Sequence, residues 1–267
     1  MFRLASLFFL KITPKITEVS LRVLILFFLL PPALLFCQPS MIETLQAFRS
    51  SVVEITVENL GAVQSPHAAA TIDKNTGRLL VLRNVKTAYY KRTGAGVIID
   101  PSGLIVTNYH VIAHANKITV GLHDHTAADA KIIRIFPQDD LAFLFINPPH
   151  PLSAIQFADS DSIKLGNEVF TIGHSELLDQ TIAGGKIIGL GTNRTKNDAD
   201  NSIDMFQVNM NLYKGDSGGP LFDRGGQLIG LIVAGQTDVD RSSFVIPSNK
   251  IKAHYLEYLA VRRDNKK

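Results

Sequence analysis

Residues 215–220 read Gly215-Asp216-Ser217-Gly218-Gly219-Pro220, a single serine inside a run of small residues. Three glycines within six positions indicate that the backbone turns sharply or approaches another group closely. A serine on such a turn exposes its hydroxyl beside backbone N–H groups, and acyl transfer needs a nucleophile beside donors for the oxygen that becomes negative. The simpler alternative is a glycine-rich turn whose serine only bonds to its neighbours. Its partners elsewhere in the chain decide between the two.

Short β-rich runs, separated by Gly, Pro and Asp turns, fill most of the chain on both sides of this stretch. They are residues 51–57, a hairpin over 96–107, 117–122, 130–136, 141–146, 168–172, 180–190, 205–208, 219–222, 227–234 and 243–246. Such a pattern is typical of antiparallel barrels or a sandwich. Residues 60–92 are harder to place, apart from a hairpin that pairs 68–72 with 78–82. A helix is expected over 40–48 and another over 249–261.

A histidine and an aspartate lie at two predicted strand ends, and with Ser217 they follow the chain order His, Asp, Ser. His110 follows the strand that ends in Val106-Thr107, and Asp139-Asp140 precede the apolar strand that begins at Leu141. A histidine that accepts the serine proton and a carboxylate that orients the histidine are the two groups that activate a serine. The three elements together favour nucleophilic catalysis over a plain turn.

These motifs resemble the trypsin-like serine proteases, and more closely the HtrA/Deg branch, from about Gly94 to about Asn249. The similarity includes Gly96-Val97-Ile98-Ile99-Asp100 and the Thr107-Asn108 before His110, and it ends with Val245-Ile246-Pro247-Ser248-Asn249. The resemblance implies an all-β fold of two six-stranded antiparallel β-barrels with a short C-terminal helix, and an active site in the cleft between the barrels.

The resemblance also assigns roles to single residues. His110 would take the proton of Ser217, and Asp140 would hold the imidazole in the right tautomer. Asp140 is chosen over Asp139 because it directly precedes the apolar strand, as the triad aspartate of the family does. Asp139 is then expected to be solvated. The N–H groups of Gly215 and Ser217 would form the oxyanion hole.

The primary specificity pocket follows from family position in the same way. Its residues would be Asn211, Leu212, Tyr213, Val233, Ala234 and Gly235. Position 211 is an asparagine and not a carboxylate, which disfavours cleavage after Arg or Lys. The pocket is therefore predicted to accept a small or medium apolar substrate side chain before the cleaved bond. The strand at 233–235 would pair with the substrate backbone, so extended or unfolded polypeptides are the expected substrates.

The first 37 residues differ in composition from the rest. Basic residues lead into an apolar run from Val23 to Cys37 that is 15 residues long and contains Pro31-Pro32. A membrane-spanning helix needs roughly 18 or more apolar residues, so the pattern indicates an export signal or an N-terminal membrane anchor. Cys37 ends the run as Leu34-Leu35-Phe36-Cys37, which resembles a loose lipoprotein box. Lipidation of Cys37 is therefore a second hypothesis, although Phe36 is larger than the residue usual there.

Residues 38–267 are predicted to form the protease domain, with barrel one at about 50–146 and barrel two at about 152–247. A proline-rich stretch, residues 147–151, would link them. Without residues 1–37 the numbers of Lys/Arg and Asp/Glu are equal, which argues against nucleic-acid binding by bulk charge. No cysteine remains for a disulfide.

Other histidines are weaker candidates for function. His110 and His114 have the spacing of a zinc pair on a helix, and His123 and His125 flank Asp124. Neither pair has the additional ligands that a zinc site needs, so the sequence predicts no metal and no cofactor. HtrA proteases usually continue into a PDZ domain, and the 18 residues after Asn249 are too few for one.

The resulting hypothesis is an exported serine endopeptidase of the bacterial periplasm or cell envelope, attached to the membrane or free, that acts in protein quality control or processing. The resemblance leaves a trimer as a candidate assembly. The first alternative is a catalytically silent trypsin-fold binding protein or chaperone of the envelope, and the second is a structural envelope lipoprotein. The sequence retains all three triad residues and so favours the enzyme.

Overall fold

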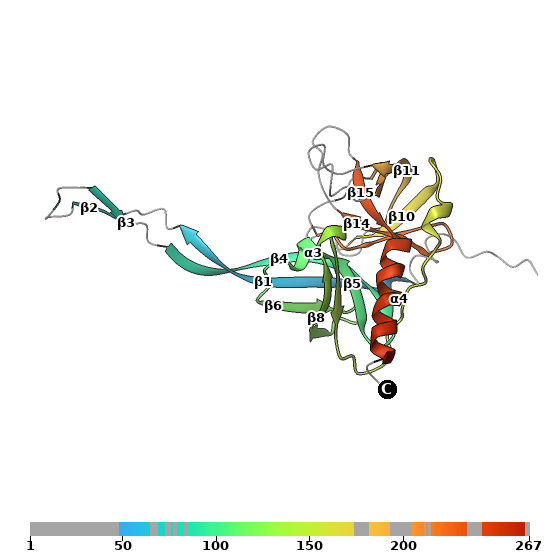
Figure 1. Ribbon diagram of the computed structural model, residues 1–267, viewed down its shortest axis with the longest axis horizontal. Helices are drawn as coiled ribbons and strands as arrows, with labels where there is room; N and C mark the ends of the chain where they lie inside the picture. The colour runs from blue at the N-terminus through green and yellow to red at the C-terminus, as the bar shows by residue number, and fades with distance from the viewer. Residues whose placement is uncertain are drawn as a thin grey trace, which may run out of the picture. The chain divides into compact units, whose positions relative to one another are not determined.

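Antiparallel strands are the predominant secondary structure of the computed structural model (Figure 1). It describes residues 48–64, 69–72, 76, 79–82, 85–173, 182–192, 204–210, 212, 215–233 and 242–264. All of these belong to one compact unit. Cys37 and the predicted helix at 40–48, except Phe48, lie outside the described residues. Among those described, no helix is both long enough and apolar enough to cross a membrane.

The N-terminal half is a seven-stranded antiparallel sheet in the order β7-β6-β1-β4-β5-β9-β8. Its strands are β1 (Val52–Gln64), β4 (Val85–Asp100), β5 (Leu104–Asn108), β6 (Lys117–Gly121), β7 (Ala127–Asp129), β8 (Lys131–Phe136) and β9 (Leu141–Phe145). Every residue of β5 is buried, as expected for a continuous apolar strand in the middle of a sheet.

The two edges of this sheet, β7 and β8, are consecutive in the chain, and no β-ladder joins them among the described residues. Its two edge strands, β7 and β8, are separated only by Ala130, whose N–H donates to the carbonyl of Ile118 in β6 at 2.9 Å. A single segment, 127–136, therefore pairs with β6 at one end and with β9 at the other. Counted as one segment it gives six around the half, which agrees with the predicted six-stranded barrel.

β1 and β4 continue beyond the sheet as a two-stranded ribbon. Their register runs without a break from Val52↔Val97 to Gln64↔Val85, and Figure 1 shows its far part extending away from the other strands. The predicted hairpin lies between them in sequence, with β2 (Ala69–Ile72) paired to β3 (Leu79–Leu82). The sequence therefore predicted the hairpin correctly but missed the length of the ribbon.

The C-terminal half is a closed barrel in the order β10-β11-β12-β15-β14-β13. Its strands are β10 (Glu168–Ile172), β11 (Ile182–Thr192), β12 (Met205–Val208), β13 (Pro220–Phe222), β14 (Leu228–Val233) and β15 (Ser243–Pro247). This confirms the predicted second six-stranded barrel. Residues 146–156, which include the proline-rich stretch, contain no strand and cross from one half to the other.

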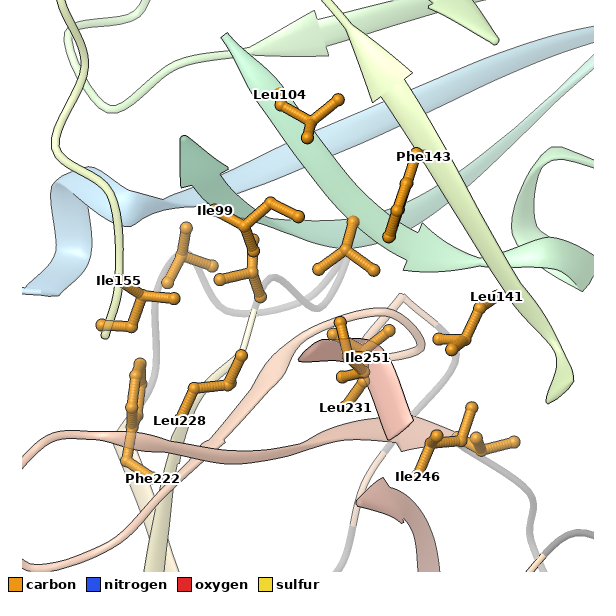
Figure 2. Packing of buried hydrophobic residues seen from close by; sticks show 14 of the residues in the cluster. Ile99, Leu104, Leu141, Phe143, Ile155, Phe222, Leu228, Leu231, Ile246 and Ile251 are labelled. Atoms are coloured by element: carbon orange, nitrogen blue, oxygen red, sulfur yellow. The ribbon is translucent and has the colours of Figure 1, made fainter. Parts of the chain in front are cut away.

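One hydrophobic cluster joins the two halves and the C-terminal helix. It includes Leu141 and Phe143 from the first half, Leu231 and Ile246 from the second, and Ile251 from α4, all labelled in Figure 2. Each of the five is fully buried. Burying one such side chain contributes about 1.5–3 kcal/mol. α4 spans Ser248–Asp264, slightly longer than the predicted 249–261. The two halves and the helix therefore share one hydrophobic core.

Candidate active site

His110 lies at the end of β5, on the one-turn helix α3 (Tyr109–Ile112). The chain leaves the sheet at Asn108, whose extended conformation starts the helix. The helix is anchored by Val111 and Ile112, which are buried in the core of the first half. The side chain of His110 keeps 41% of its surface exposed, so its ring is accessible from solvent.

Asp140 lies beside His110 because β5 pairs with β9, in the register Asn108↔Leu141. It directly follows the 3₁₀ turn η2 (Pro137–Asp139) and has φ at 51°, in the left-handed region where aspartate is one of the few tolerated residues. Its carbonyl accepts hydrogen bonds from the Tyr109 N–H at 3.0 Å and from the Asn108 side-chain amide at 3.2 Å. The main chain of Asp140 is thus tied directly to the residues that precede His110.

Both carboxylate oxygens of Asp140 bond to His110. Oδ2 lies 2.7 Å from the ring Nδ1, and Oδ1 accepts from the main-chain N–H of the same histidine at 2.9 Å. These are the lengths of charge-assisted hydrogen bonds. A carboxylate at Nδ1 favours the tautomer with its proton on that nitrogen, which leaves Nε2 as the acceptor. The ring can therefore accept a proton on the side opposite to Asp140.

Ser217 lies on the glycine turn between β12 and β13, and hydrogen bonds fix the turn on both sides. The Ser217 carbonyl accepts from the Ala95 N–H in β4 at 2.8 Å, and the Gly218 N–H donates to the Ile232 carbonyl in β14 at 2.9 Å. Gly215 and Gly218 have φ of 105° and 84°, which favour glycine. The turn is thus held by strands of both halves.

Two glycines show how closely this turn approaches the first half. A Cβ on Gly94 would lie 2.6 Å from Cγ1 of Val111, on the helix of His110, and 3.3 Å from the carbonyl oxygen of Ser217. A Cβ on Gly218 would collide with the Ala95 carbonyl and the Thr107 hydroxyl. The absence of side chains therefore lets the Ser217 turn pack against the strands that lead to His110. The close approach expected from the glycine run is confirmed.

The remaining predicted site residues are only partly described. Gly215 and Ser217 share the described turn, and Leu212 and Val233 are buried apolar residues with 8% and 0% exposure. Outside the described residues lie Asn211, Tyr213, Ala234 and Gly235. The composition of the pocket therefore stays a prediction.

Two residues next to the predicted triad have contacts that sequence reasoning missed. Asn108 is fully buried, and its amide holds the carbonyl of Asp140. Asp139 was expected to be solvated, and this was wrong. Its carboxylate binds Lys250 at 3.0 Å and His254 at 2.8 Å, both on α4. Burial raises the pKa of Asp139, but hydrogen bonds and charge from His254 and Lys250 outweigh this effect and hold the pKa below its ordinary value.

The histidines considered for zinc do not form a site in the part of the chain that the structure describes. α3 ends at Ile112, and His114 has φ at 61°, so His110 and His114 are not on one helical face. His125 also has a left-handed backbone, at the turn after β6. No group of three or more His, Cys, Asp or Glu side chains among the described residues is placed to hold a metal ion.

Comparison with known proteins gives a consistent result. The model of the family described as "Trypsin-like peptidase domain" matches residues 94–231. The periplasmic serine endoprotease DegP of Escherichia coli K12 is 37% identical over 177 residues, which cover 64% of this chain and 37% of DegP. A probable periplasmic DegP-like endoprotease of Rickettsia conorii is 39% identical over 164 residues, covering 60% of this chain and 32% of that protein. The chain spans about a third of the length of these curated relatives.

Solved structures agree with the sequence comparison. The HtrA-type protease AlgW with a tripeptide has a TM-score of 0.61 and 25% identity, over 79% of this chain and 60% of AlgW. A serine-to-alanine variant of AlgW with a decapeptide has a TM-score of 0.67 and 26% identity, over 79% and 64%. The similarity thus extends over both halves of the fold.

Proposed function

The chain belongs to the trypsin-like peptidases and is a relative of the HtrA proteases, and from this premise we propose that it is a serine endopeptidase. In this proposal Ser217 is the nucleophile, His110 the general base and Asp140 the residue that orients the histidine. The observation that carries the proposal is the pair of hydrogen bonds between Asp140 and His110, at 2.7 and 2.9 Å, together with a Ser217 turn that is hydrogen-bonded to β4.

In the proposed mechanism, Oγ of Ser217 attacks the carbonyl carbon of a peptide bond while its proton moves to Nε2 of His110. Asp140 stabilises the imidazolium that forms. The N–H groups of Gly215 and Ser217 donate to the oxygen that becomes negative, and a donor of this kind typically accounts for about a hundred- to a thousandfold in rate. The imidazolium then protonates the leaving amine, which leaves an acyl group on Ser217. Water, deprotonated by His110, releases the acid and restores the serine.

The proposed substrates are extended or unfolded polypeptides, because a chain that pairs with a strand edge must be extended. The peptides in the AlgW structures support this substrate class. We further propose an exported protein of the periplasm or cell envelope, involved in quality control or processing, because the matching relatives are named periplasmic endoproteases. Attachment through the N-terminal segment, with or without lipid on Cys37, and a trimeric assembly are part of the same proposal.

Reaction with a fluorophosphonate probe, combined with casein degradation, tests the proposal. The wild-type chain is expected to react once, and peptide mapping by mass spectrometry should place the adduct on Ser217. The unlabelled wild-type chain should also release peptides from unfolded casein at a rate proportional to its concentration. A chain that is folded but neither labels nor degrades casein would be a silent binding protein or an envelope structural protein. An adduct at another serine would exclude the proposed nucleophile.

Cleavage preference provides a separate prediction for the pocket. With no carboxylate at Asn211 and with Leu212 and Val233 buried, we expect a peptide library to be cut mainly after small or medium apolar residues. Sequencing of the new N-termini measures this preference. Cleavage mainly after Arg or Lys would show that the pocket assignment is wrong while leaving the triad intact.

A further inference from the structure

Asp139, directly before the proposed triad aspartate, is held by the C-terminal helix. Its Oδ1 lies 3.0 Å from Nζ of Lys250, and its Oδ2 lies 2.8 Å from Nε2 of His254. These partners are one helical turn apart on α4, so they present their donors to the same carboxylate. Adjacent carboxylates thus point to different partners, Asp140 to His110 and Asp139 to α4.

The contact is sheltered from water. The side chains of Asp139, Lys250 and His254 are 25%, 30% and 20% exposed. The ring of His254 also stacks on Phe136, with centroids 3.9 Å apart and planes at 24°. Because Phe136 precedes the η2 turn and Asp139 ends it, α4 contacts both ends of this three-residue turn. Ion pairs that are partly buried are screened less by solvent than those on an open surface.

The contacts of α4 with the η2 turn bear on the backbone conformation of Asp140, the residue that follows the turn. The Asp140 N–H donates to the Pro137 carbonyl at 3.2 Å, and Asp140 then adopts φ of 51°. A left-handed non-glycine residue persists where surrounding contacts determine its conformation. A change of this angle would move the Asp140 carboxylate away from the two nitrogens of His110 that it contacts at 2.7 and 2.9 Å.

α4 is itself fixed at several further points, so it can act as a rigid support. The hydroxyl of Tyr255 donates to Asp100 at the end of β4 at 2.8 Å, and the hydroxyl of Ser248 donates to the carbonyl of Ala158 at 3.0 Å. Ile251 is fully buried in the cluster that joins the halves. Burial and the Asp100 hydrogen bond raise the pKa of Tyr255 to about 12, which keeps this donor protonated over the working pH range.

We infer that Asp139 is a positioning residue, which Lys250 and His254 hold so that the η2 turn presents Asp140 to His110. The three residues form a clamp between α4 and the turn. The clamp acts on the geometry of the His110–Asp140 pair, and its effect on turnover rests on the proposed function. One measurement tests the geometry of the His110–Asp140 pair, and a second tests the effect on turnover.

The first measurement reports the pair without any catalysis. In the full chain, the ring ¹⁵N shifts of His110, recorded at a pH where the imidazole is neutral, give its tautomer. We expect wild type to hold the Nδ1–H tautomer, and Asp139→Ala to give a mixture of both. Lys250→Met with His254→Phe, which retains stacking on Phe136, should give the same mixture. Glu257→Gln removes a different α4 ion pair, the one between Glu257 and Arg134 of β8, which does not involve Asp139, and should match wild type.

The second measurement is turnover per active site, counted by titration with the fluorophosphonate so that unfolded protein does not contribute. Because misplacing a catalytic group by about 1 Å can cost up to about a hundredfold, we expect Asp139→Ala to lower kcat by about tenfold with KM unchanged. Asp139→Ala combined with Lys250→Met should be no slower than Asp139→Ala alone, since residues in one network are not additive. Glu257→Gln should keep the wild-type kcat.

The outcomes separate the two proposals. A wild-type chain that neither reacts nor turns over would overturn the serine endopeptidase, while the tautomer measurement would still decide the clamp. An unchanged His110 tautomer in both Asp139→Ala and the Lys250→Met, His254→Phe variant would overturn the clamp. So would a loss of kcat in Glu257→Gln equal to that in Asp139→Ala, or an additive loss of kcat when Asp139→Ala is combined with Lys250→Met.

Discussion

Replacing Ser217 by alanine is expected to lower kcat for peptide hydrolysis by about a millionfold, the loss seen when a serine nucleophile is removed from a triad. Without Oγ, no acyl intermediate can form, and the activity that remains comes from the oxyanion donors and substrate binding. The fold should not change, because the contacts that hold this turn are main-chain hydrogen bonds to Ala95 and Ile232. Release of peptides from casein, measured with purified full chain, gives the ratio.

Ser153→Ala is a matched control for that substitution. Ser153 is an exposed residue of the crossing between the halves, and the same chemical change there should leave the rate unaltered. If Ser217→Ala retained more than a small fraction of wild-type activity, the hydrolysis would come from another residue or from a contaminant. The assignment of the nucleophile would then be lost.

Replacing Asp140 by asparagine should lower kcat by about ten thousandfold, through the tautomer of His110. The main-chain N–H of His110 needs an acceptor at the Oδ1 position, so an asparagine would place its oxygen there and its NH₂ group opposite Nδ1. Nδ1 would then have to accept, and the ring proton would move to Nε2. A histidine protonated at Nε2 cannot take the proton of Ser217.

Steady-state kinetics and the ring ¹⁵N shifts of His110 together check this prediction, with KM expected to change little. Asp124→Asn is the control, since Asp124 is an exposed turn carboxylate in the same half that bonds to Thr126. A loss that appeared in KM alone, or an unchanged tautomer with a large loss of kcat, would contradict the role proposed for Asp140.

Local patterns in the sequence predicted most strands and the order of the candidate site. Buried strands such as β14 (Leu228–Val233) are short apolar runs between turn residues, and their bounds were nearly correct. The ribbon of β1 and β4 was missed because mixed stretches such as Glu58-Asn59-Leu60-Gly61 lack a clear period of two. The first barrel was predicted with six strands. The break at Ala130, which divides segment 127–136 into β7 and β8, has no sequence signal.

The contacts of Asp139 could not be predicted from local sequence. Its partners Lys250 and His254 follow it by 111 and 115 residues, and only the packing of α4 across the first half brings them together. A charged residue read without its neighbours is reasonably expected to be solvated. Asn108 did carry a signal, since it directly precedes the helix of His110, but its bond to Asp140 required the register of β5 and β9.

The position of α4 has a consequence for the order in which the parts of the candidate site are synthesised. A ribosome supplies His110 and Asp140 early, Ser217 much later, and Lys250 and His254 later still. A nascent chain that has all three triad residues therefore still lacks the two side chains that hold Asp139. By the clamp proposal such a chain would turn over substrate about tenfold more slowly, so the full rate would be reached only when synthesis has passed residue 254.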